Sequence, residues 1–310
     1  MDKMTFAARD GALLAYDDYR QENDKAIVIF LHGSTYNSRR YANLAKKLNG
    51  DNYGACLLNW RGHGTSEGRP GTVDYIGQLE DDLADFIQQL KTQTSKPLII
   101  CGHSAGAIIC LRYINKYGCD DIDGTSFIAP AINGPLETVR YQHPSARWQY
   151  RISYFRAAKT TEPVPSSALQ YAPSLKTMSF FGAKLLPFMR HNAILTFPAN
   201  ERMAQLEGRV LNYSYNLMLS CDINDYPGAF NKITVPTLLL CGQEDEVVHP
   251  ALLSTIFNWH LSPNIAKELI ELKNINHIQI NNAATKILPS WLDRHFSVVP
   301  EQTLCEAVSC

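Results

Sequence analysis

The chain has 310 residues, of which 45% are hydrophobic and 19% are charged, and its formal net charge is −1 at pH 7. This balance is ordinary for a globular protein with a sizeable core, and it gives no bulk attraction to nucleic acid or to an anionic membrane. No apolar run approaches the length of a membrane span, and the polar start Met1-Asp2-Lys3-Met4 does not resemble a signal peptide.

The predicted elements alternate between strand and helix. Apolar segments at 4–8 and 12–19 flank Asp10-Gly11 and predict an opening β-hairpin. Further strands are expected at 26–31, 54–59, 97–101, 124–128, 236–241 and 268–272, and helices at 39–48, 73–91, 105–117, 250–259 and 283–296. Such alternation predicts an α/β fold with a mostly parallel central sheet and helices on both faces.

Residues 136–230 interrupt this alternation. The segment is rich in aromatic residues and contains Pro163, Pro165, Pro173, Pro187 and Pro198. A connection of this length is unusual inside a compact domain, so it predicts an inserted helical cap on a core formed by 1–135 and 231–310. Its position between two core strands would set it over the carboxyl ends of the strands, where sheets of this kind place their sites.

The eight cysteines are scattered, and none has the C-x-x-C spacing. The sequence therefore predicts neither a zinc site nor a redox motif, and we expect no metal and no cofactor. Cys56, Cys101 and Cys241 fall within strand-like apolar runs, as reduced core thiols do. This usage predicts a cytoplasmic protein.

Gly102-His103-Ser104-Ala105-Gly106 lies directly between the strand at 97–101 and the helix at 105–117. A G-x-S-x-G turn in this context places its serine on a strained elbow at the end of a sheet. Small residues at 102, 105, 106 and 107 let the helix pack closely on the strand. An ordinary glycine-flanked turn is the alternative interpretation, but the order of strand, turn and helix favours Ser104 as a nucleophile.

A serine hydroxyl needs a general base, and histidine suits that role because its pKa lies near neutrality. Of the nine histidines, His277 follows the last predicted strand, where this arrangement requires a base. Asp245 follows the strand at 236–241 and is expected to orient His277. Glu244 and Glu246 are the rivals of Asp245, and we interpret both as solvated residues of an acidic turn.

Acyl transfer also requires hydrogen-bond donors for the oxyanion of the tetrahedral intermediate. The backbone N–H of Ala105 is one candidate. The N–H of Ser34, in the loop after the strand at 26–31, is the other, and Gly33 would let the main chain approach the site closely. His32 is interpreted as a turn residue that packs under this loop and has no chemical role.

Several motifs together resemble the α/β-hydrolase superfamily, in particular its monoacylglycerol lipase and lysophospholipase-like branch. The matching segments are Leu31-His32-Gly33, Trp60-Arg61-Gly62-His63-Gly64-Thr65-Ser66-Glu67-Gly68, Gly102-His103-Ser104-Ala105-Gly106, Val235-Pro236, Gly242-Gln243-Glu244-Asp245 and His277. The serine at 104 speaks against branches whose nucleophile is aspartate, and Asn59 stands where many relatives carry aspartate. The cap matches no motif, so the substrate is inferred by analogy alone.

The resemblance implies a serine carboxylic-ester hydrolase acting on monoacylglycerol, lysophospholipid or similar hydrophobic acyl esters through Ser104, Asp245 and His277. An aminopeptidase-like or thioesterase activity on the same fold is an alternative. An aminopeptidase would need clustered acidic groups in the cap, whereas Glu162, Glu201 and Glu207 are spread along the sequence. A non-catalytic ligand-binding protein on the hydrolase fold is the alternative of another class.

The most apolar part of the cap, residues 179–190, contains Phe180, Phe181, Leu185 and Phe188. Three interpretations stay open: a small core within the cap, a lining for a hydrophobic acyl chain, or transient contact with a membrane or micelle surface. Charged residues and Pro187 within this stretch exclude a membrane-spanning helix. The sequence does not define an oligomeric state.

Overall fold

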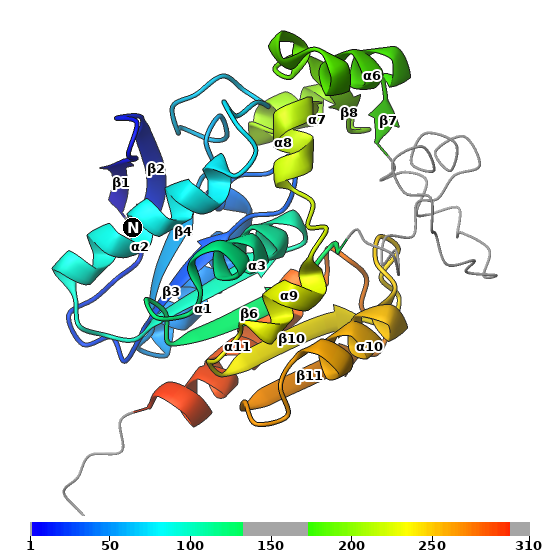
Figure 1. Cartoon of the computed structure of the whole chain (residues 1–310). Helices are drawn as coiled ribbons and strands as arrows, with labels where there is room; N and C mark the ends of the chain where they lie inside the picture. Colours follow the sequence, from blue (N-terminus) through cyan, green and yellow to red (C-terminus); the bar gives the residue numbers. More distant parts are fainter. Residues whose placement is uncertain (1, 133–172, 298–310) are drawn as a thin grey trace, which may run out of the picture.

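An eight-stranded sheet forms the centre of the molecule in the computed structural model, which describes residues 2–132 and 173–297 (Figure 1). Its strand order is β1-β2-β4-β3-β5-β6-β10-β11. The strands are β1 (Asp2–Ala7), β2 (Leu13–Asp18), β3 (Ile27–Leu31), β4 (Gly54–Leu58), β5 (Leu98–His103), β6 (Gly124–Ile128), β10 (Thr237–Gly242) and β11 (Lys267–Leu272). The predicted α/β architecture is confirmed.

The direction of the strands follows from their sequences and connections. β1 and β2 form the predicted hairpin, and β2 pairs antiparallel with β4. The remaining neighbours, from β4 to β11, pair in parallel. Every residue of β3, β4, β5, β6 and β10 is buried, which is why none of these strands shows an alternating pattern and why β3 and β4 read as continuous apolar runs.

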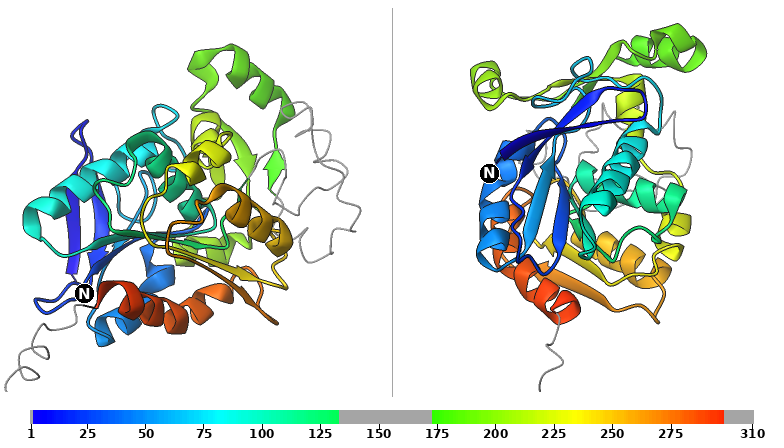
Figure 2. Two further views of the ribbon diagram at one scale, coloured as in Figure 1. Left: turned by 60° about the horizontal axis from the view of Figure 1, so that its bottom comes forward. Right: turned by 90° about the vertical axis from the view of Figure 1, so that its left-hand side faces the viewer.

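Helices cover both faces of this sheet (Figure 2). On one face, α1 (Ala42–Gly50) packs against α11 (Ile280–Phe296). On the other lie α2 (Gln78–Gln93), α3 (Ala105–Tyr117), α9 (Tyr226–Asn231) and α10 (Pro250–His260). Each core helix turns its apolar positions toward the strands, as its spacing of hydrophobic residues requires.

Two helix starts differ from the sequence prediction. The helix expected at 73–91 begins only at Gln78, because Gly77 has a φ of +111° and the preceding residues form a loop. The side chain of Gln78 stabilises that loop by accepting the N–H of Asp74 at 2.7 Å. The helix expected at 39–48 is divided into a short 3₁₀ segment, η1 (Ser38–Tyr41), and α1, with the Asn37 side chain capping the first.

The described part of the predicted cap combines helices with three short strands. It contains β7 (Ser174–Leu175), α6 (Thr177–Leu185), η2 (Pro187–Met189), β8 (Ala193–Thr196), α7 (Glu201–Glu207), β9 (Asn212–Ser214) and α8 (Tyr215–Ser220). β7, β8 and β9 form an antiparallel sheet where only helices were predicted, because strands of two to four residues are too short to show an alternating pattern. The part of the prediction at 136–172 lies outside the described residues.

The cap segment stands over the loops that leave the carboxyl ends of β3 and β4 (Figure 1). Val210 N–H donates to the carbonyl of Thr35, after β3, and Ser214 N–H donates to that of Gly71, in the loop after β4. α9 instead packs beside α3 and α10 at the core. The end of α9 at Asn231 therefore leads directly into the second half of the sheet.

Candidate active site

Ser104 occupies a sharp turn between β5 and α3. Its φ of +55° and ψ of −119° are unusual for a residue with a side chain, and the strain is held by the packing around it. A Cβ at Gly106 would lie 2.3 Å from the carbonyl oxygen of Leu31, and one at Gly102 would lie 2.4 Å from the backbone N of Ala107. Only glycine at both positions lets the helix start this close to β3 and β5.

The predicted site residues leave neighbouring parallel strands at one edge of the sheet. Ser34 follows β3, Ser104 follows β5, Asp245 follows β10 and His277 follows β11. Because the carboxyl ends of parallel strands share an edge, residues separated by more than half of the chain lie along the same edge of the sheet.

Asp245 and His277 form a buried pair. The Nδ1–H of His277 donates to Asp245 Oδ2 at 2.8 Å, while Asp245 Oδ1 accepts the N–H groups of Val247 and Val248, both at 2.8 Å. The Asp245 side chain is fully buried and that of His277 is 6% exposed. The carboxylate thus fixes the imidazole tautomer and leaves Nε2 free to accept a proton.

Glu246 corrects the interpretation of the acidic turn. Glu244 is exposed as expected, but Glu246 is buried, and its Oε2 accepts the N–H of His277 at 3.0 Å. The Glu246 carboxylate can be buried here because the backbone N–H of His277 donates a hydrogen bond to it. Asp245 therefore holds the ring of His277 and Glu246 holds its backbone.

A second histidine, His103, connects the loop of His277 with the loop after β3. Its Nε2 lies 3.0 Å from the carbonyl oxygen of His277 and must donate to it. Burial lowers the pKa of His103 well below its usual range, so the ring is neutral and its Nδ1 accepts from Tyr41 Oη at 2.9 Å. Tyr41 Oη in turn accepts the N–H of Gly33 at 2.9 Å.

The loop from Gly33 to Thr35 is fixed on both sides of Ser34. Gly33 N–H donates to Tyr41 Oη, and Thr35 N–H donates to Tyr213 Oη at 2.7 Å. The amide of Ser34 therefore lies between two N–H groups that are already hydrogen-bonded. Ala105 is the first residue of α3, where backbone N–H groups have no acceptor within the helix and the helix dipole favours negative charge. The residues on both sides of Ser34 are therefore hydrogen-bonded, and Ala105 opens α3 directly after Ser104.

His32 packs under this loop, as the sequence indicated. Its ring stacks on Trp60 with the ring centroids 4.3 Å apart, and its Nε2 accepts the backbone N–H of Trp60 at 3.2 Å. Burial lowers its pKa well below the usual range, which keeps it neutral. His32 therefore supports the loop from below.

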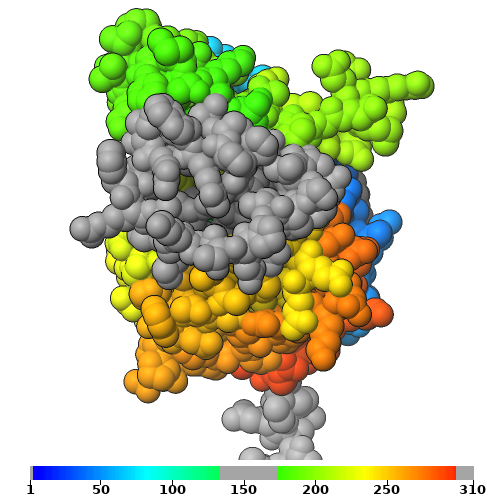
Figure 3. Space-filling model, turned by 90° about the vertical axis from the view of Figure 1, so that its right-hand side faces the viewer, coloured from blue at the N-terminus to red at the C-terminus, as the bar shows by residue number. Residues whose placement is uncertain are grey.

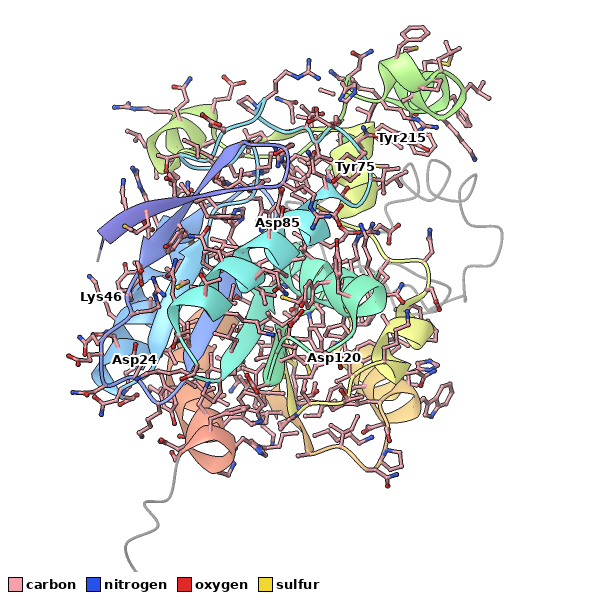
Figure 4. All side chains as sticks on the ribbon, turned by 60° about the vertical axis from the view of Figure 1, so that its left-hand side comes forward. Asp24, Lys46, Tyr75, Asp85, Asp120 and Tyr215 are labelled. Atoms are coloured by element: carbon pink, nitrogen blue, oxygen red, sulfur yellow. The ribbon has the colours of Figure 1, made fainter. Side chains whose placement is uncertain are left out.

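The four apolar residues predicted on the cap are placed differently from one another. Phe180 is buried and packs on Phe181 and on Tyr215, which Figure 4 labels at the start of α8. Leu185 and Phe188 are 77% and 76% exposed. The first two thus belong to a small core of the cap, and the last two lie on its surface.

Several known proteins are similar to this chain in sequence or in fold. Residues 22–172 match the family model described as serine aminopeptidase, S33. A crystal structure of an α/β hydrolase from Penicillium sp. superposes with a TM-score of 0.66 at 16% identity, covering 96% of this chain and 99% of that one. An esterase from Exiguobacterium antarcticum superposes with a TM-score of 0.62 at 19% identity, covering 94% of this chain and 99% of that one.

The chain has the α/β-hydrolase fold.

The chain is also similar in sequence to a monoacylglycerol lipase from Mycolicibacterium smegmatis. The two are 25% identical over 138 residues, which cover 42% of this chain and 46% of the lipase. The similarity thus spans less than half the length of that relative. It supports the branch that the sequence motifs indicated.

Two further findings concern cofactors and membranes. Within residues 2–132 and 173–297, no three His, Cys, Asp or Glu side chains gather closely enough to hold a metal ion. No helix in the same ranges combines the length and the apolar character needed to cross a bilayer.

Sequence reasoning assigned no role in the candidate site to four residues that support it: Tyr41, His103, Tyr213 and Glu246. Each acts through a contact with a residue distant in the chain. The histidine within the G-x-S-x-G turn was the one available hint, because a buried histidine at a strand end needs two partners.

Proposed function

We propose that this α/β-hydrolase is a serine carboxylic-ester hydrolase that cleaves monoacylglycerol, lysophospholipid or similar hydrophobic acyl esters. The observation that carries the proposal is the buried Asp245–His277 pair, which shares a sheet edge with Ser104 on its strained elbow. The similarity to a monoacylglycerol lipase and to an esterase supports the ester class.

In this mechanism, His277 Nε2 takes the proton from Ser104 Oγ as the oxygen attacks the ester carbonyl. Asp245 stabilises the imidazolium that forms. The N–H groups of Ser34 and Ala105 donate to the oxyanion, and His277 then protonates the departing alcohol. Water activated by the same imidazole attacks the acyl-enzyme, and the acid leaves as Ser104 recovers its proton.

The test compares the wild-type enzyme with Ser104→Ala on monoacylglycerol, lysophospholipid, acyl thioester and aminoacyl arylamide substrates. We expect hydrolysis of the oxygen esters and a loss of at least about a thousandfold in kcat with Ser104→Ala, because the nucleophile is removed. Labelling by a fluorophosphonate probe should disappear in the same variant. Turnover of esters by Ser104→Ala at the wild-type rate would contradict the proposal.

The same panel separates the other activities on this fold. An aminopeptidase is favoured by the description of the matching family model, and it would prefer arylamides to esters. In the described part of the cap, however, Glu201 and Glu207 are exposed at the two ends of α7, with no arrangement to hold a free amine. A thioesterase would prefer the thioester, and a ligand-binding protein would hydrolyse none of the substrates.

We further propose that the cap touches the surface of a lipid aggregate. Met178, Leu185 and Phe188 on α6 and η2 are each more than three-quarters exposed, and α6 stands out at the top of the face in Figure 3. An exposed apolar group of this kind suits the boundary of a lipid aggregate. The substrate class proposed above would be delivered from such a surface.

Replacing Leu185 and Phe188 together by serine should reduce sedimentation with phosphatidylcholine vesicles and activity on aggregated substrate. Activity on a short soluble ester should be unchanged. Trp259→Ser on α10 is the matched control, because Trp259 is similarly exposed, at 73%, on another part of the molecule. Equal losses in both variants, or no loss in the double variant, would contradict this role.

We also infer a reducing, cytoplasmic location. Six cysteines in the described ranges carry free thiols, and five of them are buried. Such thiols behave as small core residues rather than as halves of disulfides. Titration with a thiol reagent after unfolding should count every cysteine of the chain as reduced in protein isolated under anaerobic conditions; detection of a disulfide would contradict the inference.

A further inference from the structure

Every polar group of Thr35, the residue after Ser34, forms a hydrogen bond with one segment of the cap. Its N–H donates to Tyr213 Oη at 2.7 Å, and its carbonyl accepts the N–H of Val210 at 2.9 Å. Its hydroxyl accepts from Arg209, with Oγ1 lying 2.9 Å from Nη2 and 3.1 Å from Nε. Backbone and side chain of Thr35 are thus fixed entirely by residues 209–213.

The conformation that this binding holds is a costly one. Thr35 has a φ of +70°, which a β-branched residue rarely adopts, and its side chain is almost fully buried. A strained backbone conformation of this kind persists only where several independent contacts hold it in place. The three hydrogen-bonding contacts from the cap hold Thr35 in this conformation.

The hydrogen bonds around Tyr213 have one consistent direction. His63 Nδ1 lies 3.2 Å from the carbonyl of Arg61 and donates to it, so Nε2, 3.0 Å from Tyr213 Oη, accepts. Burial lowers the pKa of His63 to about 4 and keeps the ring neutral. Tyr213 therefore donates to His63 and has its oxygen free to accept the N–H of Thr35.

The neighbouring residues extend this contact. The guanidinium of Arg209 lies over the ring of Tyr36, 4.5 Å from its centroid. Asn37 Nδ2 donates to the carbonyl of Glu207 at 2.8 Å. Three consecutive residues of the loop after β3, Thr35 to Asn37, thus contact the segment from α7 to β9.

We propose that Tyr213 and Arg209 are positioning residues, which hold Thr35 and thereby aim the N–H of Ser34 at the oxyanion. The cap is then a structural part of the oxyanion hole as well as a cover for it. This inference rests on the proposed serine hydrolase function, in which Ser34 donates to the intermediate. It assigns to two cap residues an effect on the chemical step.

The decisive variant is Tyr213→Phe, which leaves the N–H of Thr35 buried without its acceptor. We expect kcat to fall about tenfold with KM changed less than about twofold, because the oxyanion forms only after substrate has bound. Tyr53→Phe is the matched control. Tyr53 is also buried, its hydroxyl donates to Asp293 at 2.7 Å, and it precedes β4 at the opposite edge of the sheet. It should lose thermal stability and keep its kcat.

A second pair of variants tests the hydroxyl of Thr35. Thr35→Ser keeps the acceptor for Arg209 and should retain kcat within about threefold, whereas Thr35→Val removes it and should lose about tenfold. Hydrogen exchange of amides 33–36 should accelerate in Tyr213→Phe and not in Tyr53→Phe. A kcat loss that merely follows thermal stability in both tyrosine variants would overturn the proposal.

The outcomes also separate this inference from the function on which it rests. If Ser104→Ala is inactive but Tyr213→Phe keeps the wild-type kcat, the positioning role is wrong and the hydrolase assignment stands. If Ser104→Ala keeps full activity, the assignment is wrong, and exchange at amides 33–36 then tests the contact alone. Unchanged exchange there in Tyr213→Phe would overturn it too.

Discussion

Asp245 uses both carboxylate oxygens as acceptors, one for His277 and one for two backbone N–H groups. Asparagine has one acceptor and one donor at this place. Whichever way the amide turns, a donor must face either His277 Nδ1–H or the amides of Val247 and Val248. The exchange of a single oxygen for nitrogen thus disturbs the imidazole tautomer on which the proposed mechanism depends.

We therefore predict that Asp245→Asn lowers kcat by about 10³- to 10⁴-fold while the protein stays folded. Steady-state kinetics on a short ester and a thermal unfolding curve measure the two effects. Glu244→Gln, at an exposed position of the same turn, should behave as the wild type. An Asp245→Asn enzyme that keeps a tenth of the wild-type kcat would rule out this role for Asp245.

At the residue scale, sequence reasoning places side chains relative to strand ends but does not show which of them face one another. Ser104, Asp245 and His277 could be proposed because each follows a strand of recognisable pattern. Glu246 could not, because its burial depends on the backbone of a loop 31 positions away. The contact between Tyr41 and His103 likewise spans 62 positions and has no local pattern.

At the element scale, the close approach of α3 to β3 depends on Gly106. A Cβ there would lie 2.3 Å from the carbonyl oxygen of Leu31 and 2.5 Å from that of His32. Because both neighbours are backbone atoms, a larger residue would have to move the helix or the strand. The elbow that carries Ser104 would move with it.

Gly106→Ala should therefore destabilise the fold by about 1–3 kcal/mol, as overpacked cores do, and should remove activity by displacing Ser104. Denaturant unfolding and ester kinetics measure both effects. Gly50→Ala is the control, because Gly50 is the last residue of α1 and a Cβ there meets nothing within 4 Å. It should leave stability unchanged or slightly higher. Equal stability of the two variants would contradict the packing argument.

The elements most accurately predicted are the fully buried strands β3 and β6 and the largely buried helix α3. The start of α2 was misplaced because Val73 and Ile76 continue the helical spacing of apolar residues although they belong to a loop. The strands of the cap were missed because they are stabilised by one another and not by a pattern within each.

At the scale of the whole molecule, burial lowers the pKa of three histidines in the described ranges: His32, His63 and His103. Burial lowers the pKa of all three, to about 4 for His63. A histidine whose pKa is depressed by folding stabilises the native state above its unfolded pKa of about 6.5. That contribution disappears as the pH falls toward the folded pKa, because unfolding then takes up a proton.

We accordingly predict that stability decreases between pH 6.5 and pH 4, by about 3 kcal/mol for His63 alone. Asp82 opposes this trend. Burial raises its pKa to about 6 despite the Arg61 guanidinium beside it, so its own contribution is present at low pH and is lost as the pH rises through 6. Calorimetry in buffers of different ionisation enthalpy should show net proton uptake on unfolding at pH 5.5. Net proton release there would contradict the prediction.

The strand order has a consequence for how the chain is made. β6 lies between β5, which precedes it directly, and β10, which follows the entire cap segment. While the ribosome is still producing that segment, the half-sheet ending in β6 presents an open edge of unpaired backbone groups, which is the kind of surface on which nascent chains aggregate. The serine elbow can form at this stage, whereas its base and carboxylate have not yet been synthesised. Co-translational folding therefore yields an inert half-enzyme first, and chaperone protection of β6 matters until β10 arrives.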